Sequence, residues 1–198
     1  MLNLFFLSLL TLLISASQPA DAQQPKEVAR IGLLSYNSAS LQAPRVKAFR
    51  EGLREIGYVE GQNITIEYRY ADGKPDRLPT LAAELVHLKV DVIVTLGEDA
   101  TRPAKETTST IPIVMTQDSN PVGSGFVASL ARPGGNITGL TTLAPELSGK
   151  RLELLKEVVP KLTLVAVLWD PTNTGSAMGF KETEVPARSL RVKLNPWR

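Results

Sequence analysis

Short apolar runs alternate with amphipathic segments along the chain from residue 28 onward. Each apolar run is bounded by polar residues, a pattern that predicts a strand buried in a parallel sheet. The predicted strands cover residues 28–35, 63–71, 90–96, 113–115, 136–142 and 162–169. In the second of them β-branched and aromatic residues alternate with polar ones, which predicts a strand with one wetter face.

Helical spacing of apolar residues separates these strands. Residues 44–56 are predicted to form an amphipathic helix that begins near Pro44 and stops at Gly57. The other predicted helices cover residues 78–88, 99–107, 122–130, 147–158 and 175–190. Regular strand–helix alternation predicts an α/β fold with a doubly wound, mostly parallel sheet and right-handed crossovers. We place the domain boundary at residues 141–148, so that a first lobe covers residues 28–142 and a second part covers residues 143–198.

The amino terminus has the layout of a secretory signal peptide. Residues 2–14 (LNLFFLSLLTLLI) form an apolar run that is shorter than the about 20 residues of a membrane span. A polar stretch follows, and the small residues Ala20 and Ala22 precede Gln23 as they would at a cleavage site. We therefore expect residues 1–22 to be a signal peptide and the protein to be periplasmic. Because no Lys or Arg precedes the apolar run, an uncleaved anchor and a start further upstream stay open.

Composition and motifs exclude several function classes. The net charge is +2 and no basic cluster alternates with aromatic residues, so nucleic acid is not an indicated partner. There is no cysteine for a disulfide, a zinc–thiolate site or a nucleophile. Phosphate-binding glycine motifs and metal-ligand spacings are missing as well. The single histidine, His87, lies among leucines on a predicted helix, where we expect a structural or solvent-facing role rather than a place in a catalytic triad. We predict no cofactor and no metal.

Four acidic residues follow predicted strands and have two interpretations. Glu98 and Asp99 come after the third strand, where they would serve either as an acid/base pair or as helix caps. Asp118 and Asp170 follow the fourth and last strands, and they are the candidates if the chain is an α/β hydrolase or epimerase. Polar turns at these carboxyl ends also suit a cleft for a small polar ligand, because ligands of open α/β sheets bind at that edge.

Several motifs resemble one protein family. They are FREGLREIGY at 49–58, GQNI at 61–64, EYRYA at 67–71, VDVIVTLG at 90–97, the segment 118–140 with NPVGSGFVASLARPGGNITGL, and LVAVLWDPTNTGS at 164–176. With them, residues 31–190 are similar to the substrate-binding proteins of ABC transporters, whose better-known members bind tryptophan and other aromatic amino acids. The resemblance implies a type I periplasmic binding protein, in which two Rossmann-like lobes clamp a ligand. It also implies as partners a membrane permease and its ATPase, and no catalysis.

The resemblance and the strand ends together predict the ligand-binding residues: Ser35, Tyr36, Asn37, Thr95, Gly97, Gln117, Asp118, Asp170 and Asn173. The hinge is expected at residues 141–144. One departure is Asn120, which stands where the family commonly has Asp. Members of the family also continue for about a hundred further residues, in line with usual domain sizes. We therefore expect a truncated copy whose second lobe has one strand, one helix and a ragged tail at 191–198, which leaves a decayed, non-binding fragment as a third hypothesis.

Overall fold

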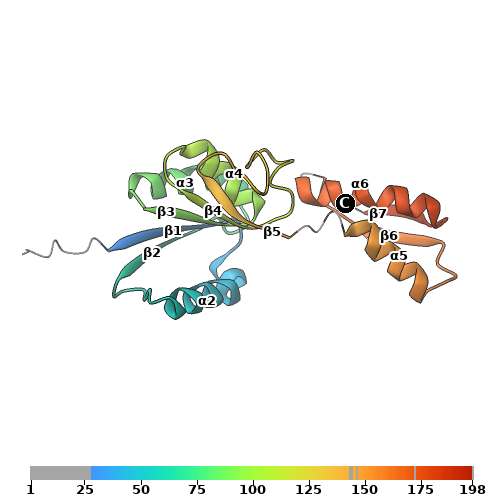
Figure 1. The fold of residues 1–198 in the computed structure, drawn as a ribbon, viewed down its shortest axis with the longest axis horizontal. Helices are drawn as coiled ribbons and strands as arrows, with labels where there is room; N and C mark the ends of the chain where they lie inside the picture. Colours follow the sequence, from blue (N-terminus) through green and yellow to red (C-terminus); the bar gives the residue numbers. More distant parts are fainter. Residues whose placement is uncertain (1–27, 143–144, 146, 172, 198) are drawn as a thin grey trace, which may run out of the picture.

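The computed structural model describes residues 28–142, 145, 147–171 and 173–197. The elements fall into two α/β groups, a larger lobe and a smaller lobe, that follow one another along the chain (Figure 1). The predicted signal segment, residues 1–22, and part of the predicted hinge lie outside the described residues. Within the described residues, no helix is long and apolar enough to cross a membrane.

The first lobe is built on a five-stranded parallel sheet in the order β2-β1-β3-β4-β5. Its strands are β1 (Ala29–Ser35), β2 (Ile64–Tyr70), β3 (Val92–Leu96), β4 (Ile113–Asp118) and β5 (Ile137–Thr141). The apolar runs of β1 and β3 reflect burial on both faces of the sheet, whereas the edge strands β2 and β5 are more exposed. The predicted α/β fold with a doubly wound, mostly parallel sheet is confirmed.

Helices cover both faces of this sheet. On one face, α2 (Ala39–Glu55) packs its apolar side against β1 and β2. On the other lie the short 3₁₀ helix η1 (Pro75–Arg77), α3 (Leu78–His87) and α4 (Glu98–Thr107), and α3 and α4 contribute to the main core. In Figure 1 the two sets of helices lie on opposite sides of the strands.

One predicted helix start and one whole predicted helix are wrong. Helix α2 begins at Ala39, because the Ser38 side chain caps it by accepting from the backbone N–H of Leu41, and Pro44 therefore lies inside the helix rather than at its start. Residues 122–130 form turns instead of a helix. Gly125 has a φ of 71°, a conformation that interrupts a helix, and the Pro121 carbonyl accepts from two later backbone N–H groups.

The second lobe contains more regular structure than the sequence predicts. Helix α5 (Ser148–Val158) leads into β6 (Leu164–Leu168), and α6 (Thr174–Ser189) crosses to β7 (Lys193–Trp197). The predicted ragged tail is wrong for β7, because parallel pairing with β6 orders this segment. Its core is small, with Leu152, Ala187 and Val192 buried. The small sheet leaves large apolar side chains in solvent, since Leu168 is 85% exposed and Trp197 60%.

Candidate ligand-binding cleft

A bulge at the end of β4 shapes the carboxyl edge of the first sheet. The register with β5 shifts between Met115 and Asp118, and Gln117 adopts a φ of 57°, which is unusual for a residue with a side chain. The extra residue reverses the alternation of the strand, so that Gln117 is exposed and Asp118 is fully buried. Strain of this kind persists where the surrounding structure holds it and is common at functional sites.

Three of the predicted site residues lie beneath this edge and are fully buried. The Ser35 hydroxyl accepts from the backbone N–H of Asn37 at 3.1 Å, and the Thr95 hydroxyl lies 2.8 Å from that of Thr101 in α4. One carboxylate oxygen of Asp118 accepts from the backbone N–H of Asn120 at 3.0 Å. Ser35 and Asp118 therefore bond to the backbone that follows their strands, and Thr95 bonds to helix α4, so none of the three side chains faces open space.

The second carboxylate oxygen of Asp118 has no hydrogen-bond partner among the described residues. Burial is the largest cause that raises the pKa of this carboxyl above its usual value, and the negative charge of Glu98 raises it further. The backbone N–H of Asn120 and the charge of Arg102 act in the opposite direction. Asp118 is therefore a carboxyl whose ionised form is costly in the folded chain.

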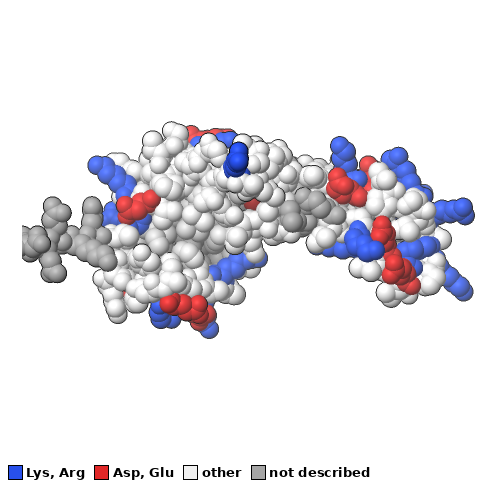
Figure 2. Space-filling view, in the orientation of Figure 1, with Lys and Arg blue, Asp and Glu red and all other residues white. Residues whose placement is uncertain are grey.

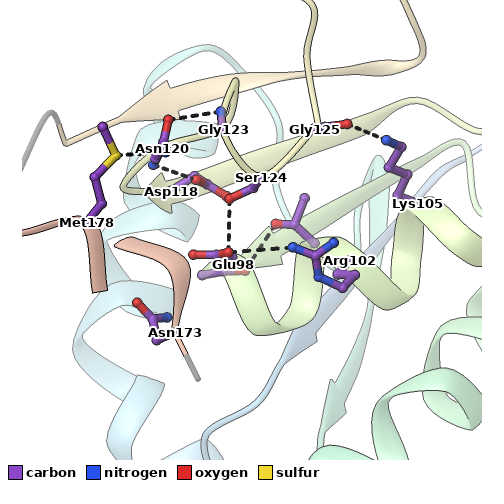
Figure 3. A network of polar contacts seen from close by, with 12 residues as sticks. Glu98, Arg102, Lys105, Asp118, Asn120, Gly123, Ser124, Gly125, Asn173 and Met178 are labelled. Carbon is purple, nitrogen blue, oxygen red and sulfur yellow. Dashed lines mark hydrogen bonds and ion pairs between the residues drawn. The ribbon is translucent and has the colours of Figure 1, made fainter. Parts of the chain in front are cut away.

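The amino-terminal half of α4 holds the segment that follows β4 (Figure 3). Glu98 accepts from the hydroxyl of Ser124 at 2.9 Å and lies 3.7 Å from Nη2 of Arg102. The guanidinium of Arg102 in turn lies over the ring of Phe126, 5.1 Å from its centroid. Lys105 donates to the carbonyl of Gly125. The predicted site residue Gly97 precedes the helix and donates to the carbonyl of Thr116 at 3.1 Å.

The start of α6 in the second lobe contacts the end of β4. Asn173 caps α6 by accepting from the backbone N–H of Ser176, and the hydroxyl of Ser176 accepts from the backbone N–H of Asp170. The side-chain amide of Asn120 in the first lobe lies 2.9 Å from the sulfur of Met178. Figure 3 shows Asn173 and Met178 facing the network around Glu98. The two lobes therefore meet at residues that follow strands β4 and β6.

Two cavities border this junction, and Asn173 lines both. The first has a volume of about 180 Å³ and is lined by η1, the start of α3 and the start of α4 as well as by Asn173: Pro75, Leu78, Glu98, Asp99, Arg102, Pro103 and Asn173. The second, of about 360 Å³, extends from Ser119 into the second lobe. There the rings of Trp169 and Phe180 stack with centroids 4.7 Å apart.

The remaining predicted site residues lie near the ends of strands, in environments that differ in exposure. Asn173 lines the cavities, and Asp170 lies near enough to Asp99 to raise the pKa of that carboxyl, although burial is the larger cause. Gln117 is exposed and Asn37 is half-buried at the same sheet edge, whereas Tyr36 packs partly against the core. Sequence reasoning treated Glu98 and Asp99 as catalytic or capping acids and missed Arg102, whose spacing of four residues from Glu98 was the available signal. Among the described residues, no group of three or more acidic, His or Cys side chains is placed to hold a metal.

Comparison with known proteins identifies relatives of this chain. A family model described as "ABC transporter substrate binding protein" matches residues 31–197. The tyrosine-binding protein of Clostridioides difficile (strain R20291) is 32% identical over 160 residues, which are 81% of this chain and 45% of that protein. The chain thus spans about half the length of this curated relative.

Solved structures give the same result. A conserved domain protein from Vibrio cholerae is 27% identical with a TM-score of 0.80, over 86% of this chain and 57% of that one. An ABC domain from Streptococcus pneumoniae in complex with L-Trp has a TM-score of 0.77 at 24% identity, over 85% of this chain and 56% of that one, which supports the fold. Because the family model covers most of the sequence and these folds agree with it, the chain belongs to the ABC transporter substrate-binding protein family, and its fold is that of a type I periplasmic binding protein.

Proposed function

We propose that this chain is the extracytoplasmic solute-binding component of an ABC importer, which holds a small amino acid between its lobes and delivers it to a permease driven by an ATPase on other chains. The observation that carries the proposal is the cavity of about 180 Å³, whose lining comes from both lobes. A ligand that contacts both lobes favours the closed arrangement by its differential affinity for it.

The size and lining of the cavity support a small polar ligand. Its volume is below the roughly 300–1,000 Å³ of sites for drug-sized molecules. It combines the apolar side chains of Pro75, Leu78 and Pro103 with charged groups from α4. The names of two relatives, one a tyrosine-binding protein and one crystallised with L-Trp, favour an amino acid as the ligand.

Of the predicted residues Asn173 lines this cavity, and we propose ligand contacts also for the other predicted residues near the strand ends that are not fully buried. These are Tyr36, Asn37, Gly97, Gln117 and Asp170. Ser35, Thr95 and Asp118 would then support the strand ends that carry them. Replacing Thr95 and Asp118 together by Ala should weaken ligand binding, because both side chains bond to backbone or side-chain groups at that edge; unchanged affinity would refute their assignment to the site.

We propose binding without catalysis. The single histidine, His87, is exposed at the carboxyl end of α3, and Glu98 and Asp118 are engaged with Ser124 and Asn120. This favours the binding protein over the hydrolase or epimerase that Asp118 or Asp170 would serve. Export through the signal segment at residues 1–22 completes the proposal; detection of intact residues 2–14 on periplasmic protein would refute cleavage after Ala22.

A ligand screen tests the function directly. The purified chain is mixed with the twenty amino acids and other small polar metabolites, and melting temperature and heat of binding are measured. Saturable stabilisation by at least one amino acid, with the ligand recovered unchanged by mass spectrometry, is the expected result. Conversion of the ligand would favour the enzyme. No stabilisation by any amino acid would refute the proposed function and favour the non-binding fragment.

A further inference from the structure

The cavity between the lobes carries charges of both signs on one helix. Glu98 and Asp99 occupy the first turn of α4, and Arg102 follows one turn later. All three line the cavity together with Asn173 of the second lobe. Apolar lining comes from Pro75, Leu78 and Pro103.

We propose that this cavity binds the zwitterionic head group of an α-amino acid, with its carboxylate on the guanidinium of Arg102 and its ammonium beside Asp99 and Glu98. The inference rests on the proposed function and specifies which residues select its ligand class. Asn173 has both donor and acceptor atoms and would close the site from the second lobe.

Arg102 is oriented and yet has free donor capacity. Its contact with Glu98 is 3.7 Å, longer than a hydrogen bond, and its side chain is half exposed, so the ion pair does not occupy an N–H donor of the guanidinium. The ring of Phe126 lies 5.1 Å from its central carbon and supports the flat face of the group. A guanidinium held by its face presents its edge, the geometry that binds a carboxylate with two parallel hydrogen bonds.

The two carboxylates provide the complementary end. Glu98 is only 9% exposed and uses one oxygen for the Ser124 hydroxyl, which fixes its position. Burial and the charges of Glu98 and Asp170 raise the pKa of Asp99, so negative charge accumulates here beyond what Arg102 compensates. A ligand ammonium would relieve this repulsion, which favours an amino acid over a simple carboxylic acid.

The competing explanation is structural. Arg102 and Glu98 also tie the segment after β4 to α4 through Phe126 and Ser124, and the acids suit the positive end of the helix dipole whether or not a ligand binds. A purely structural role predicts that removing Arg102 weakens all ligands alike. A head-group role predicts that only ligands with a carboxylate lose affinity.

The test compares matched probes on matched variants. L-Tyrosine, tyramine and 3-(4-hydroxyphenyl)propanoate are titrated calorimetrically, together with L-alanine, ethylamine and propanoate as a smaller set. The variants are Arg102→Met, Arg102→Lys, Asp99→Asn and the control Arg54→Met, an exposed residue on α2 far along the chain from the cleft. Melting temperatures identify any variant that fails to fold, and Arg102→Lys retains the charge if Arg102→Met is unstable.

We expect Arg102→Met to lower the affinity for the amino acid roughly ten- to hundredfold, the effect of one lost charge-assisted contact. The affinity for the amine should change by no more than about twofold. Arg102→Lys should have an affinity for the amino acid between those of the parent chain and Arg102→Met. Asp99→Asn should lower the affinity for the amine and leave that for the acid unchanged. Equal losses for amino acid and amine, or no loss, would overturn the inference and leave the proposed function standing. Failure of the parent chain to bind any of these probes would also overturn the inference. If, in addition, none of the twenty amino acids stabilised the chain in the wider screen, the proposed function would be refuted as well.

Discussion

Gly175 marks the point where the second lobe approaches the first, and its replacement by Ala offers a direct test of closure. A Cβ atom at Gly175 would lie 2.4 Å from Cβ and 2.8 Å from the hydroxyl oxygen of Ser119 at the end of β4. Non-bonded carbons prefer about 3.5–4.0 Å, so α6 would have to move away from the first lobe by about 1 Å. The substitution should therefore hold the cleft partly open.

The magnitude follows from two opposing effects. Within α6, Ala should be favourable by up to about 1 kcal/mol, because Gly is a poor helix residue. Between the lobes, overpacking of this size costs about 1–3 kcal/mol. An arrangement with the lobes this close bears the second cost and an open arrangement does not, so the affinity for an amino acid that binds between the lobes should fall roughly five- to hundredfold.

Calorimetric titration measures the affinity, and small-angle X-ray scattering measures the radius of gyration with and without ligand. Ser119→Gly in the same chain removes the Cβ that causes the clash, so the double variant Gly175→Ala/Ser119→Gly should recover affinity and compaction. Gly52→Ala in α2 is the control, since nothing lies within 4 Å of its new Cβ. If Gly175→Ala binds ligand and scatters like the parent chain, the lobes do not close through this contact and the argument fails.

Three further predictions concern stability. Gly139→Ala should lower the urea midpoint by the equivalent of at least about 1–3 kcal/mol, because its Cβ would meet the Met115 carbonyl at 1.9 Å; an unchanged midpoint would contradict the close β4–β5 approach. Burial raises the pKa of Asp118, so its contribution to stability is complete below about pH 4 and is lost as pH rises through its folded pKa; Asp118→Asn should flatten this slope, and a parallel profile would exclude Asp118 as its source. Amide hydrogen exchange should be faster in β6, with one neighbouring strand, than in β1, with two; equal protection would show that the second lobe is as stable as the first.

The buried strands were predictable because a strand that is buried on both faces consists almost entirely of apolar residues. β1 and β3 are apolar runs whose side chains lie in the core on both faces, so the run and the strand nearly coincide. Residues 122–130 show the limit of the same reasoning, because their apolar spacing suits a helix while Gly123 and Gly125 permit turns. Contacts with α4, through Ser124 and Phe126, then decide between the two. β7 was missed for a similar reason: its order depends on pairing with β6, a partner remote in sequence.

The sequence predicts at which edge of the sheet a ligand site would lie, but not which side chains face it. Any parallel sheet with polar turns gathers them at its carboxyl edge, and in the structure Gln117 lies at the end of β4 while Asn173 follows β6. It could not foresee the bulge at Gln117, because a strand one residue longer or shorter has the same apolar pattern, yet that bulge turns Asp118 from the surface into the interior. The pair Glu98 and Arg102 likewise reads in sequence as a helix-surface ion pair. What makes it part of a cavity is the position of η1 and α6 across from it, and those neighbours are set by tertiary packing alone.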